Sequence, residues 1–149
     1  MKDTFVVDAS VAVKLFVPER DSEKAHLLFS SLARPRPFRL FAPTLLYVEC
    51  ANTLWKYCQF FHYDEDVAEH NLRELRELDL QTVPDEELFL PAFQLAQRHK
   101  VSVYDALYLA LAEVLECRLV TADRRLVRQL EDSIPFLTLL RKLKLEAAG

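Results

Sequence analysis

The sequence contains almost no glycine: among 149 residues the only one is the last, Gly149. Phosphate-binding P-loops, dinucleotide-binding fingerprints and nucleophile elbows all require glycine, because the backbone must approach a ligand closely or adopt a positive φ angle. The shortage therefore excludes all three motifs. It also argues against a nucleotide that is held by backbone amides.

The usual metal and disulfide patterns of cysteine and histidine are also missing. The three cysteines, Cys50, Cys58 and Cys117, are odd in number and form no C-x-x-C pair, which argues against a disulfide framework and against a zinc site. Cys50 and Cys58 fall in one apolar helical run and are expected in the core. The four histidines form no H-x-x-x-H pair, so none is a strong candidate for a metal ligand or a base.

Long hydrophobic runs are absent as well. No apolar stretch approaches the roughly 20 residues of a membrane span, and the N-terminal "MKDTFVVDAS" does not have the layout of a signal peptide. With 51% hydrophobic residues and a formal net charge of −4, the chain is predicted to be one soluble, cytoplasmic domain over residues 1–149. The charge still permits nucleic-acid binding, because a basic rim around an acidic site gives the same total.

Short β-branched runs alternate with helical patterns along the chain. The predicted strands are "TFVV" ending at Asp8, "RLFA" (39–42), "LQTV" (80–83), "CRLVT" ending near Thr121, and "FLTL" (136–139). The predicted helices are 10–17, 21–33, 44–61, 64–78, 85–99, one that contains "SVYDALYLALAE", and a short one from Arg124. This alternation predicts an α/β fold with a parallel sheet that helices cover on both faces.

Caps and breakers refine these boundaries. Thr44 and Asp64 are expected to cap the helices that follow them. Pro91 lies inside the helical pattern 85–99 and predicts a kink or a helix that restarts there. "RPRP" at 34–37 is predicted to be a loop, and a basic tail, "LRKLKLE", ends the chain.

Four acidic residues fall where the strands of such a sheet end. Asp8 ends the first strand, Asp123 follows "RLVT", Glu49 is in the second turn of the helix after the second strand, and Asp105 begins its helix. In parallel sheets, ligands bind outside the carboxyl ends of the strands. Two carboxylates about 4 Å apart repel by roughly 4 kcal/mol at an effective dielectric constant of 20. A carboxylate set without histidine or cysteine suits Mg²⁺ or Mn²⁺ and predicts metal-assisted phosphodiester hydrolysis.

Each of these acids also has a purely structural interpretation. Asp8 and Asp123 could cap the helices that follow them, and Ser102 with Asp105 has the spacing of a capping box. Glu49 shares its helix face with Asn52, Thr53 and Lys56, which could be a solvent-facing stripe. The small hydroxyl residues Ser10 and Thr121 could equally form turns.

Three segments, taken together, resemble the PIN-domain ribonucleases, especially the VapC-type toxins of prokaryotic toxin–antitoxin pairs. They are "VVDASVAVKLF", "LLYVECANTLWK" and "SVYDALYLALAEVLECRLVTADRRL", and the resemblance covers nearly the whole chain. It implies a three-layer α/β/α fold with a central parallel sheet. It also implies Mg²⁺- or Mn²⁺-dependent cleavage of single-stranded RNA.

The resemblance assigns roles to individual positions. Asp8 and Asp105 match the firmest metal ligands, whereas Glu49 and Asp123 match acids that complete the metal shell and orient the attacking water. The matching supporting positions are the hydroxyl residues Ser10 and Thr121 and the basic pair Arg124 and Arg125, which could meet phosphate. One departure concerns the turn before "SVYDA", where many relatives carry glycine and this chain has Lys100 and Val101.

The segment "LWKYCQFFHY" is apolar over a wider band than one core-facing stripe requires. The helix could be sandwiched in the core. Alternatively, the band is an exposed patch for self-association or for an antitoxin segment. The resemblance implies both a homodimer and a cognate antitoxin, so we predict a dimer contact near Trp55 or Phe60.

Two other functions compete with the ribonuclease. A non-catalytic PIN-like module for RNA or protein binding would be favoured by loss of the acids, but all four are present. A metal-dependent phosphatase of the haloacid-dehalogenase type would need a second aspartate two residues after Asp8, where Ser10 stands. The ribonuclease is therefore the preferred hypothesis.

Overall fold

Five strands form one parallel sheet in the computed structural model, which describes residues 3–34 and 38–145. The strands are β1 (Thr4–Val7), β2 (Arg39–Pro43), β3 (Gln81–Val83), β4 (Arg118–Thr121) and β5 (Leu137–Leu139). Their order is β3-β2-β1-β4-β5, and Val6 of the central strand pairs with Phe41 on one side and Leu119 on the other. The predicted parallel sheet is confirmed. Residues 35–37 of the predicted "RPRP" loop lie outside the described residues.

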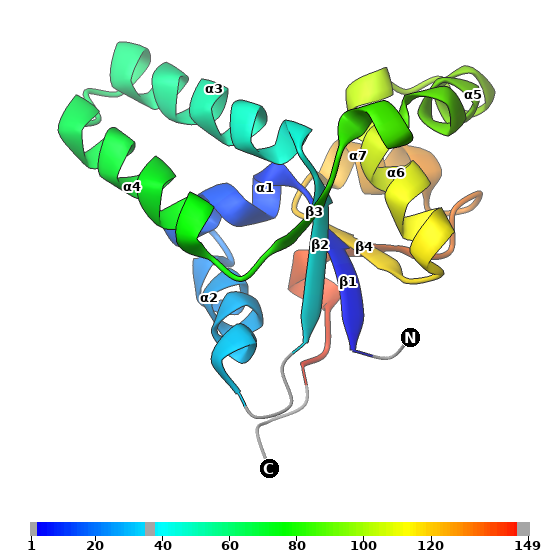
Figure 1. The fold of residues 1–149 in the computed structure, drawn as a ribbon, viewed down its shortest axis with the longest axis horizontal. Coiled ribbons are helices and arrows are strands. Elements are labelled where there is room, and N and C mark those ends of the chain that lie inside the picture. Colours follow the sequence, from blue (N-terminus) through cyan, green and yellow to red (C-terminus); the bar gives the residue numbers. More distant parts are fainter. Residues whose placement is uncertain (1–2, 35–37, 146–149) are drawn as a thin grey trace.

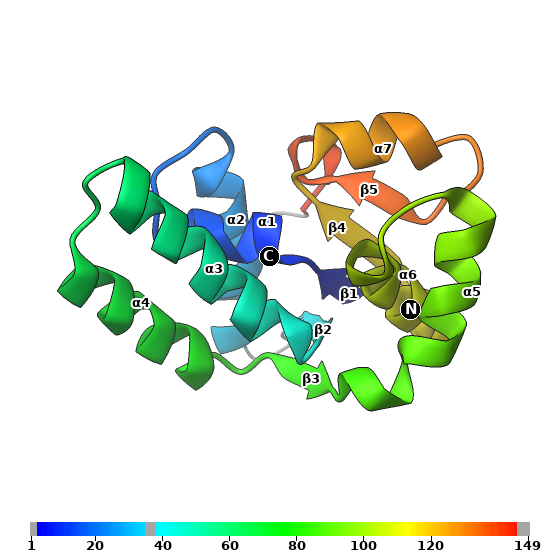
Figure 2. The same cartoon turned by 90° about the horizontal axis from the view of Figure 1, so that it is seen from above.

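Helices lie on both faces of the sheet, which confirms the predicted α/β/α layering. The α-helices are α1 (Ala9–Ala12), α2 (Ser22–Ser30), α3 (Leu45–Phe60), α4 (Glu65–Glu77), α5 (Phe89–His99), α6 (Val103–Leu115) and α7 (Arg124–Leu130). The 3₁₀ turns are Val13–Leu15, Ser31–Ala33, Asp85–Glu87 and Leu140–Lys142. Helices α1 to α4 lie on one side of the sheet and α5 and α6 on the other, with α7 beside β5 (Figure 1, Figure 2). No helix in the described segments has the length and hydropathy to cross a membrane.

Helix α6 is the most deeply buried helix, as its apolar sequence predicts. All seven residues from Ala106 to Ala112 are buried, because α6 packs against the sheet on one side and against α5 on the other. Burying a leucine such as Leu109 or Leu111 contributes about 2 kcal/mol relative to exposing it. This burial anchors α6, so its first turn, which carries Asp105, is held in place at the end of the sheet.

Side-chain caps were predicted at Asp64 and at Thr44, and only the cap at Asp64 is present. The prediction for Asp64 is confirmed, since its carboxylate accepts hydrogen bonds from the first backbone N–H groups of α4. The prediction for Thr44 is wrong, because its side chain makes no capping bond to α3. Instead, the Asp85 carboxylate accepts from Leu45 N at 3.0 Å, and Asp85 N donates to Thr44 Oγ1 at 3.2 Å. The cap of α3 therefore comes from a residue 40 positions further along the chain.

The prediction of an interrupted helix at 85–99 is confirmed. The chain makes a 3₁₀ turn at Asp85–Glu87 and starts α5 at Phe89. Pro91 thus lies in the first turn of α5, where its missing N–H leaves no intrahelical hydrogen bond unmade.

Non-glycine residues adopt the left-handed conformation where a chain with more glycine would use glycine. The residues with positive φ are Asp21, His62, Lys100 and Glu116. Lys100 has φ 57° and ψ 46° and ends α5, immediately before the segment that holds Asp105. Gln129 Nε2 donates to the Lys100 carbonyl at 3.2 Å and fixes the turn from α7. The turn thus has left-handed geometry although lysine stands there.

The left-handed turn leads to a prediction about stability. Lys100→Gly removes a Cβ from a conformation that costs a non-glycine residue about 1 kcal/mol or more. We expect the melting temperature to rise by roughly 2–4 °C, as 1 kcal/mol does in a chain of this size. Circular dichroism melts of Lys100→Gly and of Lys100→Ala would test this, since the alanine variant removes the charge but keeps the Cβ. Equal melting of the two variants would contradict it.

The apolar band of α3 is divided between the core and the surface. Leu54 is 1% exposed, whereas Trp55, Phe60 and Phe61 are 53%, 68% and 70% exposed. The rings of Trp55 and Phe60 pack edge to face with centroids 6.3 Å apart. The end of α3 thus carries an exposed aromatic patch, which we call the α3 aromatic patch (Trp55, Phe60 and Phe61).

Candidate active site

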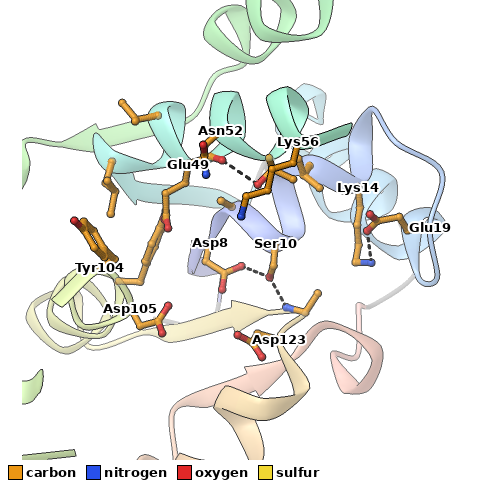
Figure 3. A pocket seen from close by; sticks show the side chains of 17 residues that line it. Asp8, Ser10, Lys14, Glu19, Glu49, Asn52, Lys56, Tyr104, Asp105 and Asp123 are labelled. Carbon is orange, nitrogen blue, oxygen red and sulfur yellow. Dashed lines mark hydrogen bonds and ion pairs between the residues drawn. The ribbon is translucent and has the colours of Figure 1, made fainter. Parts of the chain in front are cut away.

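A pocket of about 640 Å³ lies at the carboxyl edge of the sheet, and all four predicted acids line it (Figure 3). Each acid comes from a different part of the fold. Asp8 follows β1, Glu49 belongs to α3, Asp105 to the first turn of α6, and Asp123 lies between β4 and α7. The sheet topology brings β1 and β4 side by side, and α3 and α6 approach their ends from opposite faces.

Asp8 is the most buried of the four acids, with 8% of its surface exposed. Its Oδ1 accepts hydrogen bonds from Ser10 Oγ and from Val11 N, so it caps α1 as its position predicts. Its Oδ2 accepts from Thr121 Oγ1 on the neighbouring strand. Three donors therefore hold the Asp8 carboxylate in one orientation, which explains how a carboxylate can be accommodated at the end of a central strand.

The two predicted hydroxyl residues connect the ends of β1 and β4. Ser10 Oγ accepts from Ala122 N at 2.8 Å and lies 3.3 Å from Thr121 Oγ1. Thr121 Oγ1 also accepts from Asp123 N at 3.1 Å. Ser10 and Thr121 thus form a small polar network that positions Asp8 and the Asp123 backbone relative to each other.

Glu49 is held from across the pocket by a tyrosine. Tyr108 of α6, which is 2% exposed, donates its hydroxyl to Glu49 Oε1 at 2.6 Å. This bond joins α3 to α6, the two helices that carry Glu49 and Asp105. The stripe of Asn52, Thr53 and Lys56 on the same face of α3 also lines the pocket, so this face of the helix is the wall of a cavity.

Asp105 and Asp123 both lie at helix starts. Ser102 Oγ accepts from Asp105 N at 3.1 Å, so the predicted cap of α6 is present. Asp123 Oδ1 accepts from Arg125 N and Leu126 N at 3.0 and 3.2 Å, so Asp123 caps α7. Capping and a place in the pocket are therefore compatible for both residues.

Burial, with a smaller contribution from like charges, disfavours the ionised forms of Asp8, Glu49 and Asp105. Burial raises the pKa of Asp8 to about 6, against the lowering effect of its hydrogen bonds, and the Asp105 charge adds to the rise. Burial also raises the pKa of Asp105, with a further contribution from Asp123. The pKa of Glu49 is raised by burial in the same way, although the Tyr108 hydrogen bond opposes this. Bringing the acids together thus costs free energy at neutral pH.

Positive charge in the pocket is scarce. Lys14 and Lys56 are the cationic side chains that line it, and Lys14 Nζ is paired with Glu19 at 3.1 Å. Among the residues that the structure describes, no lysine or arginine forms an ion pair with any of the four acids. A bound cation would remove the charge imbalance, and carboxylate oxygens are the donors that Mg²⁺ and Mn²⁺ prefer.

The donor set fits a hard divalent cation, but the carboxylates are not gathered around one point. Within residues 3–34 and 38–145, no three Asp, Glu, His or Cys side chains stand close enough to hold an ion directly. Mg²⁺ commonly keeps several waters and uses only one or two protein carboxylates. The residues present are therefore compatible with an ion that is held partly through water.

Some lining residues were not identified from the sequence, and two predicted residues, Arg124 and Arg125, lie elsewhere. Tyr104, Tyr108, Lys14 and Glu19 line the pocket in addition to the predicted set. Lys14 had a usable signal, because it is the only charged residue between Asp8 and Glu19. By contrast, Arg124 and Arg125 are exposed at the start of α7 and are not among the lining residues.

Comparison with known proteins agrees with the fold. A model of the PIN domain matches residues 5–130. Ribonuclease VapC3 of Pyrobaculum aerophilum is 40% identical over 126 residues, which cover 83% of this chain and 92% of that protein. Ribonuclease VapC9 of Mycobacterium tuberculosis is 34% identical over 121 residues, which cover 81% of this chain and 87% of that protein.

Solved structures share the fold. A crystal structure from Pyrobaculum aerophilum superposes with a TM-score of 0.66 at 22% identity, covering 93% of this chain and 84% of that one. A toxin–antitoxin complex from Klebsiella pneumoniae gives a TM-score of 0.62 at 18% identity, with coverage of 93% and 98%. This chain therefore belongs to the PIN-domain family, among the VapC ribonucleases. The resemblance inferred from the sequence is confirmed.

Proposed function

We propose that this chain is a metal-dependent endoribonuclease that hydrolyses phosphodiester bonds of single-stranded RNA and acts as the toxin of a toxin–antitoxin pair. The observation that carries the proposal is the pocket itself, which four carboxylates from separate elements line and in which, among the described residues, none of them is ion-paired with a lysine or arginine. Its 40% identical relative is a VapC ribonuclease, which supports RNA as the substrate. We place its action in the cytoplasm, where such a substrate is found.

Each acid has a proposed role. Asp8 and Asp105 would hold a Mg²⁺ or Mn²⁺ ion, and Glu49 and Asp123 would complete its surroundings and orient the attacking water. When bound, the ion would polarise a phosphate oxygen and lower the pKa of water at the site. Ser10 and Thr121 keep the Asp8 carboxylate directed into the pocket, while Tyr108 does the same for Glu49.

Cleavage should depend on a divalent ion, and this can be tested directly. After chelation and dialysis, we expect the protein to cleave a labelled single-stranded RNA at least about 100-fold more slowly, because metal contributes several kcal/mol to such reactions. Added Mg²⁺ or Mn²⁺ should restore the rate. Asp105→Asn, purified identically, controls for contaminating nucleases, since asparagine can keep the start of α6. Equal cleavage with and without metal would refute the proposal.

The proposed partners are a cognate antitoxin and a second copy of the chain. A structural neighbour is a toxin–antitoxin complex, which supports an antitoxin. The α3 aromatic patch supports self-association, because the paired rings of Trp55 and Phe60 are both more than half exposed, and exposed apolar patches mark interaction sites. We expect the dimer contact to include Trp55 or Phe60.

Sedimentation should detect this dimer. We expect the isolated protein to sediment as a dimer at about 50 µM, and Phe60→Ser to shift it toward monomer, because the substitution removes apolar area from the contact. Phe93→Ser is a matched control, since Phe93 is 53% exposed on α5, on the other side of the sheet. A monomeric wild type, unchanged by Phe60→Ser, would remove the dimer proposal and leave the nuclease proposal intact.

A further inference from the structure

We propose that the pocket also defines the path of the RNA strand, with a base stacked on Tyr104 at one end, a phosphate bound by Lys56 beside the carboxylates, and Lys14 contacting the strand at the other end. This inference rests on the proposed ribonuclease function. Figure 3 shows Tyr104 at one end of the pocket, the carboxylates and the Lys56 ammonium in the middle, and Lys14 toward the far end. A volume of about 640 Å³ is more than one phosphate group needs.

Lys56 is the exposed cation on the α3 wall of the pocket. Glu49 and Lys56 are seven residues apart on one helix face, which corresponds to about 10 Å along the helix axis. The Lys56 side chain extends back from there toward Asp8 and Ser10 (Figure 3), so a phosphate that Lys56 binds lies next to the carboxylates. Lys56 is exposed, and within the described residues its ammonium forms no ion pair. Its charge is thus available to a polyanion.

Lys14 differs from Lys56 because it is buried and fixed. Its Nζ donates to Glu19 Oε2 at 3.1 Å and to the Arg20 carbonyl at 2.7 Å. Glu19 in turn accepts a hydrogen bond from Tyr57 of α3. An ammonium has three N–H donors, and these bonds use two of them in the part of the chain that the structure describes. Lys14 can therefore offer one pre-oriented donor to the strand at the far end of the pocket, although Glu19 offsets much of its charge.

Tyr104 provides the opposite contact. It precedes Asp105 in the first turn of α6, lines the pocket, and is 62% exposed. Among the described residues, its ring has no aromatic or cation–π neighbour. Exposed tyrosine rings beside a phosphate-binding groove stack unpaired bases without sequence preference. A duplex cannot present such a base, so the arrangement favours a single strand.

The two ends of the path should have different signatures in a binding experiment. The probe is a fluorescein-labelled single-stranded RNA of about 10 nucleotides, titrated with Asp8→Asn protein so that it stays intact, over a series of salt concentrations. In this background, Lys56→Gln should lower the slope of log Kd against log salt by about 0.7, the value for one phosphate contact in a single strand. Lys14→Met should weaken binding with a smaller change of slope. Tyr104→Ala should weaken binding about 5-fold or more without changing the slope, and Tyr104→Phe should restore it.

Matched controls separate this path from unspecific effects. Lys142→Ala removes an exposed lysine that lines a separate cavity at the opposite edge of the sheet, and Phe89→Ala removes an exposed ring on α5. Neither should change the affinity or the slope. An unchanged slope in Lys56→Gln, or an unchanged affinity in Tyr104→Ala, would overturn the path while wild-type cleavage still supported the ribonuclease. If the parent neither binds nor cleaves RNA, the path and the ribonuclease proposal both fail.

Discussion

Asp8→Asn is expected to abolish RNA cleavage and, at the same time, to stabilise the metal-free protein at neutral pH. Burial raises the pKa of Asp8 from 3.8 to about 6 in the folded state, and a difference of two pKa units corresponds to about 3 kcal/mol. Because the folded state holds the Asp8 proton more tightly, the contribution of Asp8 to stability is greatest below pH 4, falls between pH 4 and 6, and is constant above. Asparagine carries no charge, so it avoids this cost.

The expected effects of Asp8→Asn are large enough to measure in one set of experiments. Cleavage in Mg²⁺ should fall at least about 100-fold, while the melting temperature at pH 7 in a chelator should rise by roughly 5–10 °C. At pH 4 the two proteins should differ little. The asparagine oxygen can still accept from Ser10 Oγ and Val11 N, so the start of α1 is retained. A less stable Asp8→Asn protein at pH 7 would mean that the carboxylate is needed mainly for the fold.

Added Mg²⁺ is expected to recover the stability that the charged pocket costs. An ion that binds only the native state contributes about 2.7 kcal/mol at a concentration of 100 Kd, which corresponds to a rise of roughly 5–10 °C in the melting temperature. Ion and proton compete for Asp8, so the rise should be clear at pH 7.5 and much smaller at pH 5, below the Asp8 pKa of about 6. Calorimetric melts across a Mg²⁺ series at both pH values would measure it.

The control for the metal effect replaces all four carboxylates by amides. In the variant Asp8→Asn, Glu49→Gln, Asp105→Asn and Asp123→Asn, the melting temperature should not respond to Mg²⁺ at either pH. Asparagine at 8 and 123 can still cap α1 and α7, so the variant is expected to fold. An equal rise in wild type and variant would assign the stabilisation to ions bound elsewhere.

The pocket of this protein is a compromise between the stability of the fold and the proposed catalytic activity. The proposed chemistry needs the acids in the pocket, and holding them there costs free energy. Packing and hydrogen bonds elsewhere in the fold offset this cost. The buried helix α6 and the hydrogen bonds of Ser10, Thr121 and Tyr108 hold the acids in place. Such sites are where stabilising substitutions are expected to cost activity.

The sequence alone was enough to predict the fold class and to predict which acids line the pocket. Strands such as "TFVV" and "RLVT" and the uniformly apolar α6 are local patterns, and parallel strands place their carboxyl ends at one edge wherever helices alternate with them. That rule was enough to predict that Asp8, Glu49, Asp105 and Asp123 meet, and all four line one pocket. The caps at Asp64, Ser102 and Asp123 were also predictable, because a cap is a contact within one turn.

Contacts between distant segments could be decided only by the tertiary structure. Asp85 caps α3 from 40 residues away, and Tyr108 donates to Glu49 from 59 residues away. No periodicity in the sequence contains either pairing, because the first depends on the pairing of β2 with β3 and the second on how α3 and α6 approach the sheet. Long-range packing also places Lys14 and Glu19 in the pocket, whereas Arg124, at the start of α7, does not line it. Local patterns determined which elements form, and long-range packing decided which side chains share the cavity.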